Sequence, residues 1–378
     1  DRDRNGHAER TEILASGWGH TVDYHDWAVG IATDVDGNYY IATPCQQDDR
    51  SPAAAYLRGQ VMQLAPRQPT ADDPQKYSLN PLSAGHRFPV GIARNRQGEM
   101  FVTDNQGNYN PFNELNHVIA GRRYGFINKL DRAADFKPPL TPPAIDIPHP
   151  WTRSVNGICF LETPERLRAA GRRDHFGPWE GHLVGCEYDT RRLIRMSLQR
   201  VGDTIQGAAY PLTLDKPAQG EPLLGPLACA VSPGGDLYIG SIRDSGWGGA
   251  NNIGTLVRMR INSHDLPAGI AEVRAVAAGL EVHFTQPIDR QKALDLTNYS
   301  LISYTRVSTP AYGSPDQQLR IEKPLSVEVA ADGRRVLVKL AELREGFVYD
   351  LKLKKLVAAD EVFFPAEAYY TLRKAPAR

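Results

Sequence analysis

Residues 85–107 read GHRFPVGIARNRQGEMFVTDNQG, a stretch with two short apolar runs separated by a polar turn. The first run surrounds Gly91, the second spans 100–103, and Gln97-Gly98 lies between them. Short apolar runs joined by glycine-bearing turns are typical of antiparallel strands in a tight hairpin. We therefore expect two consecutive strands, followed by a polar loop of the kind in which such folds place functional residues.

The same arrangement recurs along the chain. Further copies begin at Gly30, Gly157 and Ala228, so that successive copies lie 61, 66 and about 70 residues apart. A repeat of this length, built from short strands and long loops, predicts β-propeller blades rather than a solenoid. We predict an all-β fold with about four propeller blades in residues 1–262, and one short surface helix at 164–170.

The pattern changes near residue 262. A polar linker at 262–269 is followed by alternating strands without the blade spacing, with turns at Asp332-Gly333 and Glu345-Gly346. About 100 residues of such strands predict a small β-sandwich over residues 268–375. This part has no cluster of His, Asp or Glu at catalytic spacing, and we interpret it as an accessory domain that packs on the propeller or binds a partner.

Composition argues against several partner classes. Lys and Arg together number 44, as do Asp and Glu, so the formal net charge is zero. The sequence has no basic stripe interleaved with aromatic residues, which argues against nucleic acid as the main partner. No apolar run approaches the length of a membrane-spanning helix. The four cysteines lie far apart without a Cys-x-x-Cys motif. We interpret them as buried thiols, with a disulfide between Cys159 and Cys186 as the alternative.

Residues 86–126 resemble the soluble quinoprotein glucose and sorbosone dehydrogenases. The resemblance rests on His86-Arg87-Phe88-Pro89-Val90-Gly91, Asn105-Gln106-Gly107-Asn108, Glu114-Leu115-Asn116 and Tyr124-Gly125-Phe126, in this order. Over residues 1–375 the chain is also similar to large secreted proteins of planctomycete-type bacteria described as membrane-bound dehydrogenases, which often carry a c-type cytochrome module. The C-terminal part, with FTQPID at 284–289, resembles bacterial Ig-like domains.

The resemblance implies a six-bladed propeller, a sugar or polyol substrate, and a periplasmic or secreted location. It also implies that electrons pass to a quinone or to a cytochrome partner. Since residues 1–262 encode about four blades, we expect N-terminal blades to be missing from this sequence.

Two cofactors are implied by the resemblance, pyrroloquinoline quinone (PQQ) and calcium. The positions assigned to PQQ binding are His86, Arg87, Gln106, Arg191 and Arg192. Those assigned to calcium are Gly107, Asn108 and Glu114. Phe88 replaces a family asparagine, and paired family arginines have no counterpart near 225–227. Because PQQ has three carboxylates that need cationic partners, we expect it to bind weakly or not at all.

The catalytic candidate is His25, in the segment Tyr24-His25-Asp26-Trp27 before the first strand pair. The resembled family has its general base at this place. A histidine suits the role because it accepts a hydroxyl proton near neutral pH while hydride leaves the carbon. The alternative is a loop histidine packed on Trp27. Trp247 and Trp179 offer flat faces for stacking on a sugar ring, or are loop side chains without a ligand.

The N-terminus holds a separate signal. Its residues Asp1, Asp3, Asn5, Gly6 and Glu12 have the spacing of an EF-hand calcium loop. The alternative is a solvated polar turn.

We predict a sugar or polyol dehydrogenase of the quinoprotein type. The alternative is a non-catalytic propeller that serves as a scaffold or binds carbohydrate within a large secreted protein. A calcium-dependent lactonase or lyase is a third interpretation, but it needs carboxylates around the central channel, which the predicted inner strands do not supply.

Overall fold

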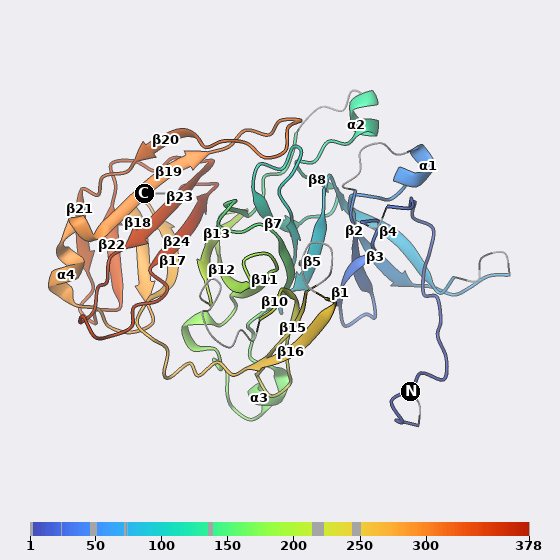
Figure 1. Ribbon diagram of the computed structural model, residues 1–378, viewed down its shortest axis with the longest axis horizontal. Helices are drawn as coiled ribbons and strands as arrows, with labels where there is room; N and C mark the ends of the chain where they lie inside the picture. The colour runs from blue at the N-terminus through green and yellow to red at the C-terminus, as the bar shows by residue number, and fades with distance from the viewer. Residues whose placement is uncertain are drawn as a thin grey trace.

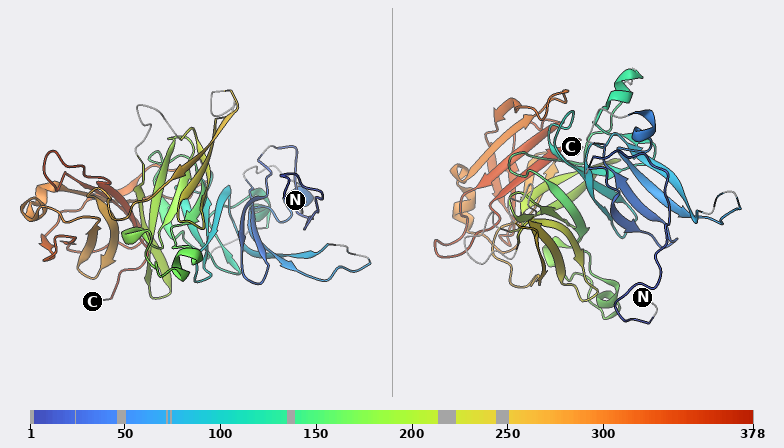
Figure 2. Two further views of the ribbon diagram at one scale, coloured as in Figure 1. Left: turned by 90° about the horizontal axis from the view of Figure 1, so that it is seen from below. Right: turned by 45° about the vertical axis from the view of Figure 1, so that its right-hand side comes forward.

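The protein is described by a computed structural model. It describes residues 3–23, 25–45, 51–71, 73, 75–134, 139–213, 223–243 and 251–377. Their strands form five sheets, with the C-terminal strands at one end of the long axis and the N-terminal sheet at the other (Figure 1). The same order along the long axis is seen from below (Figure 2). Within these residues, no helix is long and apolar enough to cross a membrane.

The predicted propeller blades are four groups of mainly antiparallel strands in chain order. Blade 1 contains β1 (Val29–Thr33), β2 (Tyr39–Thr43), β3 (Gln60–Pro66) and β4 (Tyr77–Ala84), with β8 (Arg122–Arg123) parallel to β4. Blade 2 contains β5 (Pro89–Arg94), β6 (Met100–Asp104), β7 (Asn113–Val118) and β9 (Ile145–Ile147). Blade 3 contains β10 (Val155–Phe160), β11 (Leu183–Glu187), β12 (Arg192–Val201) and β13 (Thr204–Pro211). Blade 4 contains, in its described part, β14 (Pro226–Val231), β15 (Leu237–Arg243) and β16 (Ile253–Met259).

Helices are short and lie in the connections. They are α1 (Pro52–Ala55), α2 (Lys129–Ala133), α3 (Glu165–Ala169), α4 (Arg290–Leu294) and the 3₁₀ turns Gly177–Trp179 and Leu296–Asn298. The helix predicted at 164–170 is confirmed as α3, with Pro164 at its N-cap. Proline suits the start of a helix because its missing N–H has no intrahelical partner there.

The innermost strands of neighbouring blades pack against one another in chain order, β1 on β5, β5 on β10 and β10 on β14. Each of these four strands has an irregular register near its beginning, where the pairing with the second strand of its blade shifts. A shift of this kind is a β-bulge, which bends the strand and re-aims its backbone.

Glycine occupies this bulge in blades 1 to 3. A Cβ added to Gly30 would come within 2.0 Å of Ile92 Cγ2, and one added to Gly91 within 2.1 Å of the Asn156 carbonyl oxygen. For Gly157 the nearest atom would be the Leu227 carbonyl oxygen, at 2.5 Å. Each of these neighbours belongs to the following blade, so the glycines allow the blades to approach closely.

Two four-stranded sheets form the predicted C-terminal sandwich. One contains β17 (Ile270–Val276), β18 (Gly279–Phe284), β22 (Arg335–Lys339) and β21 (Ser326–Val329). The other contains β24 (Glu367–Leu372), β23 (Phe347–Leu353), β19 (Tyr299–Thr305) and β20 (Gln317–Ile321). This second sheet continues into blade 3, because β24 pairs with β13 through contacts such as Gly207 with Thr371. The sandwich is therefore joined to the propeller by strand pairing.

A buried cation strengthens this junction. Arg195 of β12 is fully buried and donates hydrogen bonds to the carbonyl oxygens of Ala271, at 2.6 Å, and Ile270, at 2.9 Å. Its guanidinium also lies 4.3 Å from the centre of the Tyr210 ring. A buried charge is tolerated only when such partners replace water, so the arginine fixes β17 against blade 3.

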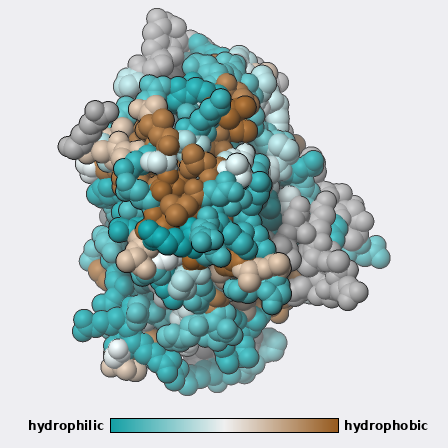
Figure 3. Space-filling view, turned by 90° about the vertical axis from the view of Figure 1, so that its left-hand side faces the viewer, coloured by the Kyte–Doolittle hydropathy of each residue, from teal (hydrophilic) through white to brown (hydrophobic). Residues whose placement is uncertain are grey.

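The far end of the sandwich carries exposed apolar side chains. The exposed side chains Leu319, Ile321 and Leu325 lie on β20 and directly after it. The space-filling view of this end shows apolar side chains gathered among hydrophilic ones (Figure 3).

Blades 3 and 4 share an apolar core that contains three of the four cysteines, Cys159, Cys186 and Cys229. The Cys229 sulfur lies 3.8 Å from the Gly157 carbonyl oxygen and 3.9 Å from that of Val184. All four cysteines of the chain are thiols, and the alternative disulfide between Cys159 and Cys186 is not formed.

The close approach of the blades can be tested with Gly91→Ala. The added methyl group would overlap the Asn156 carbonyl, and we expect a loss of about 1–3 kcal/mol or more in the free energy of unfolding, measured in urea. Gly240→Ala is the matched control, since this strand glycine has its nearest neighbour 3.9 Å from an added Cβ. Equal stability of the two variants would contradict this account of blade packing.

Candidate functional site

The candidate site lies at the end of the propeller where the innermost strands begin. Pro89, the first residue of β5, pairs with Asp104, the last residue of β6. The loop after β6 therefore lies beside the segment that leads into β5. We call this end of the propeller the rim, and define it by residues 23, 25–27, 86–88, 104–110, 187 and 312.

A buried carboxylate organises the rim. Asp104 accepts hydrogen bonds from the backbone N–H groups of Arg87, at 2.8 Å, and Phe88, at 2.6 Å. Blade 3 repeats the arrangement, because Glu187 at the end of β11 accepts from the N–H groups of Arg153, at 2.9 Å, and Ser154, at 2.8 Å. In both blades the carboxylate fixes the two residues that lead toward the innermost strand.

Burial makes Asp104 and Glu114 hard to ionise. It raises the pKa of Asp104 to about 6, although the two backbone hydrogen bonds and the nearby Arg87 act to lower it. Burial, together with the charges of Asp104 and Asp146, raises the pKa of Glu114 well above its ordinary value. The side chain of Glu114 accepts a hydrogen bond from Asn116 at 3.2 Å.

His86 is fully buried beneath the rim. Its Nε2 lies 2.9 Å from the Ser83 hydroxyl, and its ring stacks on Tyr124 with 4.7 Å between centroids. Burial and the charge of Arg123 lower the pKa of His86 to about 3, so the ring is neutral. Asp104 Oδ2 is 3.9 Å from His86 Nδ1, beyond hydrogen-bond distance. His86 thus supports the fold of the rim, and its position differs from the predicted contact with a cofactor.

Arg87 is also withdrawn from solvent, with 4% of its surface exposed. Its guanidinium donates to the Gln106 carbonyl oxygen at 3.0 Å. A Cβ added to Gly107 would come within 2.0 Å of Arg87 Nε, which shows how closely the loop covers the arginine. The ring of Tyr312, from the sandwich, lies 5.2 Å from the guanidinium carbon.

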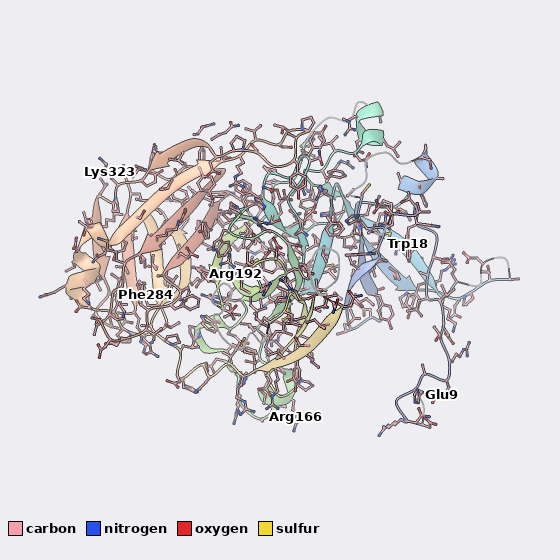
Figure 4. The ribbon with its side chains drawn as sticks, in the orientation of Figure 1. Glu9, Trp18, Arg166, Arg192, Phe284 and Lys323 are labelled. Carbon is pink, nitrogen blue, oxygen red and sulfur yellow. The ribbon has the colours of Figure 1, made fainter. Side chains whose placement is uncertain are left out.

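The remaining predicted site residues are distributed over the molecule. Arg192 stacks 4.6 Å over the Trp151 ring and donates to the Trp151 carbonyl, in the middle of the molecule (Figure 4). Arg191 adopts a left-handed backbone, φ 60°, in the turn before β12. Trp179 is only 8% exposed and lies in the core of blades 3 and 4, so its ring is not presented to a soluble sugar. Trp247 lies outside the described residues.

His25 lies at the rim with an acidic partner. Its Nδ1 is 2.7 Å from Asp23 Oδ1, and its ring meets the Phe88 ring edge-on at 5.5 Å. Burial raises the pKa of Asp23, but hydrogen bonds from the backbone and ring of His25 outweigh it, and the net shift is downward. Trp27, which is 44% exposed, lies 5.6 Å from Phe88. The N–H of Asn105 donates to the Phe88 carbonyl oxygen at 3.4 Å, so His25 and the loop after β6 lie at the same end.

The calcium candidates fall into two groups. At the rim, the Gly107 carbonyl oxygen accepts from the N–H of Gly313, and the Asn108 amide donates to the Pro310 carbonyl oxygen. Glu114 is close to Gly107 and Asn108 in sequence and is buried. Its carboxylate accepts a hydrogen bond from Asn116. Among the described residues, no group of three or more His, Cys, Asp or Glu side chains is arranged to hold a metal ion.

The N-terminal group lies on an extended segment away from the sheets, where Glu9 is labelled (Figure 4). Asp3 accepts hydrogen bonds from the backbone and side chain of Asn5, at 3.1 and 2.9 Å. Glu12 pairs instead with Arg10 and Lys76, each at 2.7 Å. Asp1 lies outside the described residues.

The rim does not fit PQQ as the chain is folded here. The cofactor needs cations opposite three carboxylates, and charge-assisted bonds to them require accessible donors. Arg87 is covered by its own loop and by Tyr312, Arg192 is engaged by Trp151, and His86 is neutral. No step of a reaction is therefore derived through PQQ.

Sequence reasoning missed two residues of the rim, Asp23 and Tyr312. The Asp-x-His spacing of Asp23 and His25 could have indicated the pair, because a carboxylate two residues away can reach the ring nitrogen. Tyr312 lies in the segment TPAYGSP at 309–315, where an aromatic residue in a loop rich in turn residues was the only signal.

The chain is similar to several solved structures. No protein-family profile matches the chain, and no curated protein sequence matches it. A glucose dehydrogenase-type oxidoreductase of Thermus thermophilus is 19% identical, with a TM-score of 0.43 over 64% of this chain and 68% of that one. The PQQ-bound aldose sugar dehydrogenase of Streptomyces coelicolor is 19% identical, with a TM-score of 0.40 over 61% of each chain. The apo-form soluble aldose sugar dehydrogenase of Escherichia coli is 18% identical, with a TM-score of 0.38 over 61% of this chain and 63% of that one.

The buried state of His86 can be tested by the pH dependence of stability. Unfolded His86 binds a proton below pH 6.5, whereas the folded ring does so only near pH 3. The unfolded state therefore binds more protons between these values, and the stability that His86 confers is lost as the pH falls. Between pH 7.5 and pH 5 this loss is about 2 kcal/mol.

We expect the stability difference between wild type and His86→Asn, measured by urea unfolding, to shrink by about this amount on acidification. The exposed His7→Asn serves as the control and should show no such change. A difference that grows on acidification would indicate a charged His86 paired with Asp104 instead.

Proposed function

We propose that this chain is a sugar- or polyol-binding propeller of the quinoprotein dehydrogenase type. The observation that supports it most is the combination at the rim of His25, its partner Asp23 and the exposed ring of Trp27. Sugar sites pair an aromatic surface, against which the C–H groups of the ligand lie, with a few polar groups that orient its hydroxyls.

The rim offers both kinds of contact. Trp27 and Phe88 provide the apolar surface, and the imidazole of His25 and the carboxylate of Asp23 are the polar groups beside it. We propose that the sugar lies against Trp27 with one hydroxyl toward His25. The burial of Arg87 and His86 favours binding over oxidation, because it withdraws the residues that would hold a quinone.

Oxidation of the bound sugar or polyol is the second candidate, favoured by the His25–Asp23 pair. A carboxylate only accepts hydrogen bonds, so Nδ1 of His25 donates to Asp23, and in a neutral ring the lone pair then lies on Nε2. This is the form in which a histidine accepts a hydroxyl proton. The electrons released by this oxidation would pass to a quinone or cytochrome partner, as the family resemblance implies.

Other parts of the proposal rest on the family resemblance. They are a periplasmic or secreted location, a c-type cytochrome module as partner, membership of the planctomycete-type proteins, and an Ig-like character for the sandwich. Calcium bound by Gly107, Asn108 and Glu114, or by the N-terminal loop with Asp1, Asp3, Asn5 and Glu12, is also a proposal. It requires that millimolar calcium raise the melting temperature above that measured with a chelator.

Sugar binding can be measured by calorimetry with glucose, other aldoses and glucitol. We expect dissociation constants in the millimolar range or tighter, and roughly tenfold weaker binding in Trp27→Ala and His25→Ala, since each removes one contact worth about 1–1.5 kcal/mol. Val35→Ala, an exposed residue in the turn between β1 and β2, is the control and should bind as wild type does. Absence of binding to every sugar would overturn the proposal.

Titration with PQQ and calcium separates the two candidates. Each missing charge-assisted bond costs on the order of 1.5–3 kcal/mol, so two missing partners weaken binding by roughly two to four powers of ten. We therefore expect no submicromolar PQQ binding. A submicromolar dissociation constant that Arg87→Ala abolishes would favour the dehydrogenase instead.

A further inference from the structure

The sandwich reaches the rim through one long connection. Residues 306–316, between β19 and β20, extend from the sandwich toward blade 2, and we call this segment the arm (Figure 1). Its base is fixed by Arg306, whose guanidinium donates to the carbonyl oxygens of Pro111, at 3.2 Å, and His149, at 2.8 Å. The same group lies 4.7 Å from the centre of the Phe112 ring. The arm is therefore anchored on the propeller.

The tip of the arm is bonded to the loop that follows β6. The N–H of Tyr109 donates to the Thr309 carbonyl oxygen at 2.8 Å, and the Ser308 hydroxyl donates to the Tyr109 carbonyl oxygen at 2.8 Å. The N–H of Gly313 donates to the Gly107 carbonyl oxygen at 3.1 Å. Bonds on both sides of residues 310–312 hold this turn in one place relative to the rim.

Tyr312 is the aromatic residue that this turn presents. It pairs with Asn108 through a β-bridge, and its ring lies 5.2 Å from the guanidinium carbon of Arg87. A cation at this distance from a ring is attracted by its π-face. Even so, 66% of the surface of Tyr312 remains exposed. One side of the ring is thus held by Arg87, while much of the side chain faces solvent.

We propose that Tyr312 is a ligand-contacting residue of the rim, which makes the sandwich part of the binding site and selects cyclic sugars over acyclic polyols. This inference rests on the proposed function, since it concerns the same ligand. Arg87 contacts the ring of Tyr312, and the next residue, Phe88, contacts the ring of Trp27, so one short segment of the rim touches both aromatic side chains.

The selectivity follows from the shape of the ligands. A pyranose ring presents several C–H groups in one rigid plane, and such a plane stacks on an aromatic face held in a fixed place. An acyclic polyol such as glucitol has to lose rotational freedom in its carbon chain before it can offer a comparable face. An immobilised ring such as Tyr312 therefore favours the pyranose, whereas hydrogen bonds to hydroxyl groups serve both ligands.

The experiment is calorimetry of the full chain with methyl glucoside, which stays cyclic, and with glucitol. For Tyr312→Ala we expect roughly fivefold to tenfold weaker binding of the glucoside and less than twofold change for glucitol. Tyr312→Phe keeps the ring and should restore glucoside binding. Leu319→Ala, an exposed residue of β20, is the matched control and should bind both ligands as wild type does.

Failure of this inference can be distinguished from failure of the proposed function. If wild type binds the glucoside and Trp27→Ala weakens it, but Tyr312→Ala does not, the proposed function stands and the role of Tyr312 is overturned. Equal losses of glucoside and glucitol in Tyr312→Ala would overturn the selectivity. If wild type binds neither of these ligands nor any of the other aldoses, both are overturned. A thermal melt of each variant identifies loss of fold, and Tyr312→Phe then decides whether the ring is needed.

Discussion

The close approach of neighbouring innermost strands is the constraint on which the rest of the structure depends. Gly30, Gly91 and Gly157 each lie in a bulge where a side chain would overlap the next blade. Because the three strands meet in the same way, their beginnings fall at one end of the propeller. The loops at this end are then close enough to share hydrogen bonds, as between Asn105 and Ser154 of successive blades.

The rim uses its charged residues to hold its own backbone. Asp104 and Glu187 accept from successive N–H groups, and Arg87 donates to the loop that covers it. Charged groups that are buried and already bonded to the backbone are poorly placed to grip a charged cofactor. Two exposed side chains at the rim, Trp27 and Tyr312, are aromatic, and the exposed Asn108 carries an uncharged amide. This division favours an uncharged, partly apolar ligand such as a sugar.

Sequence patterns predicted the blades and the sandwich because each blade is encoded locally, in apolar runs and turns, with a glycine in the innermost strand of blades 1 to 3. The pattern could not predict which family-matched residues would be buried. His86 and Arg87 carry the resemblance, yet their accessibility depends on Tyr124 and on a loop 19 residues further along. The contact of Tyr312 with Arg87 joins residues far apart in the chain, and one sequence alone contains no signal for such a pair.

Hydrogen–deuterium exchange with and without a saturating aldose tests most directly whether propeller and sandwich form one binding site. The account predicts slower exchange in residues 23–27 and in the arm, 306–316, when the sugar is present, with little change in the β20–β21 end of the sandwich. Protection of one of these two segments without the other, or protection only at a distant surface, would contradict the claim of a shared site.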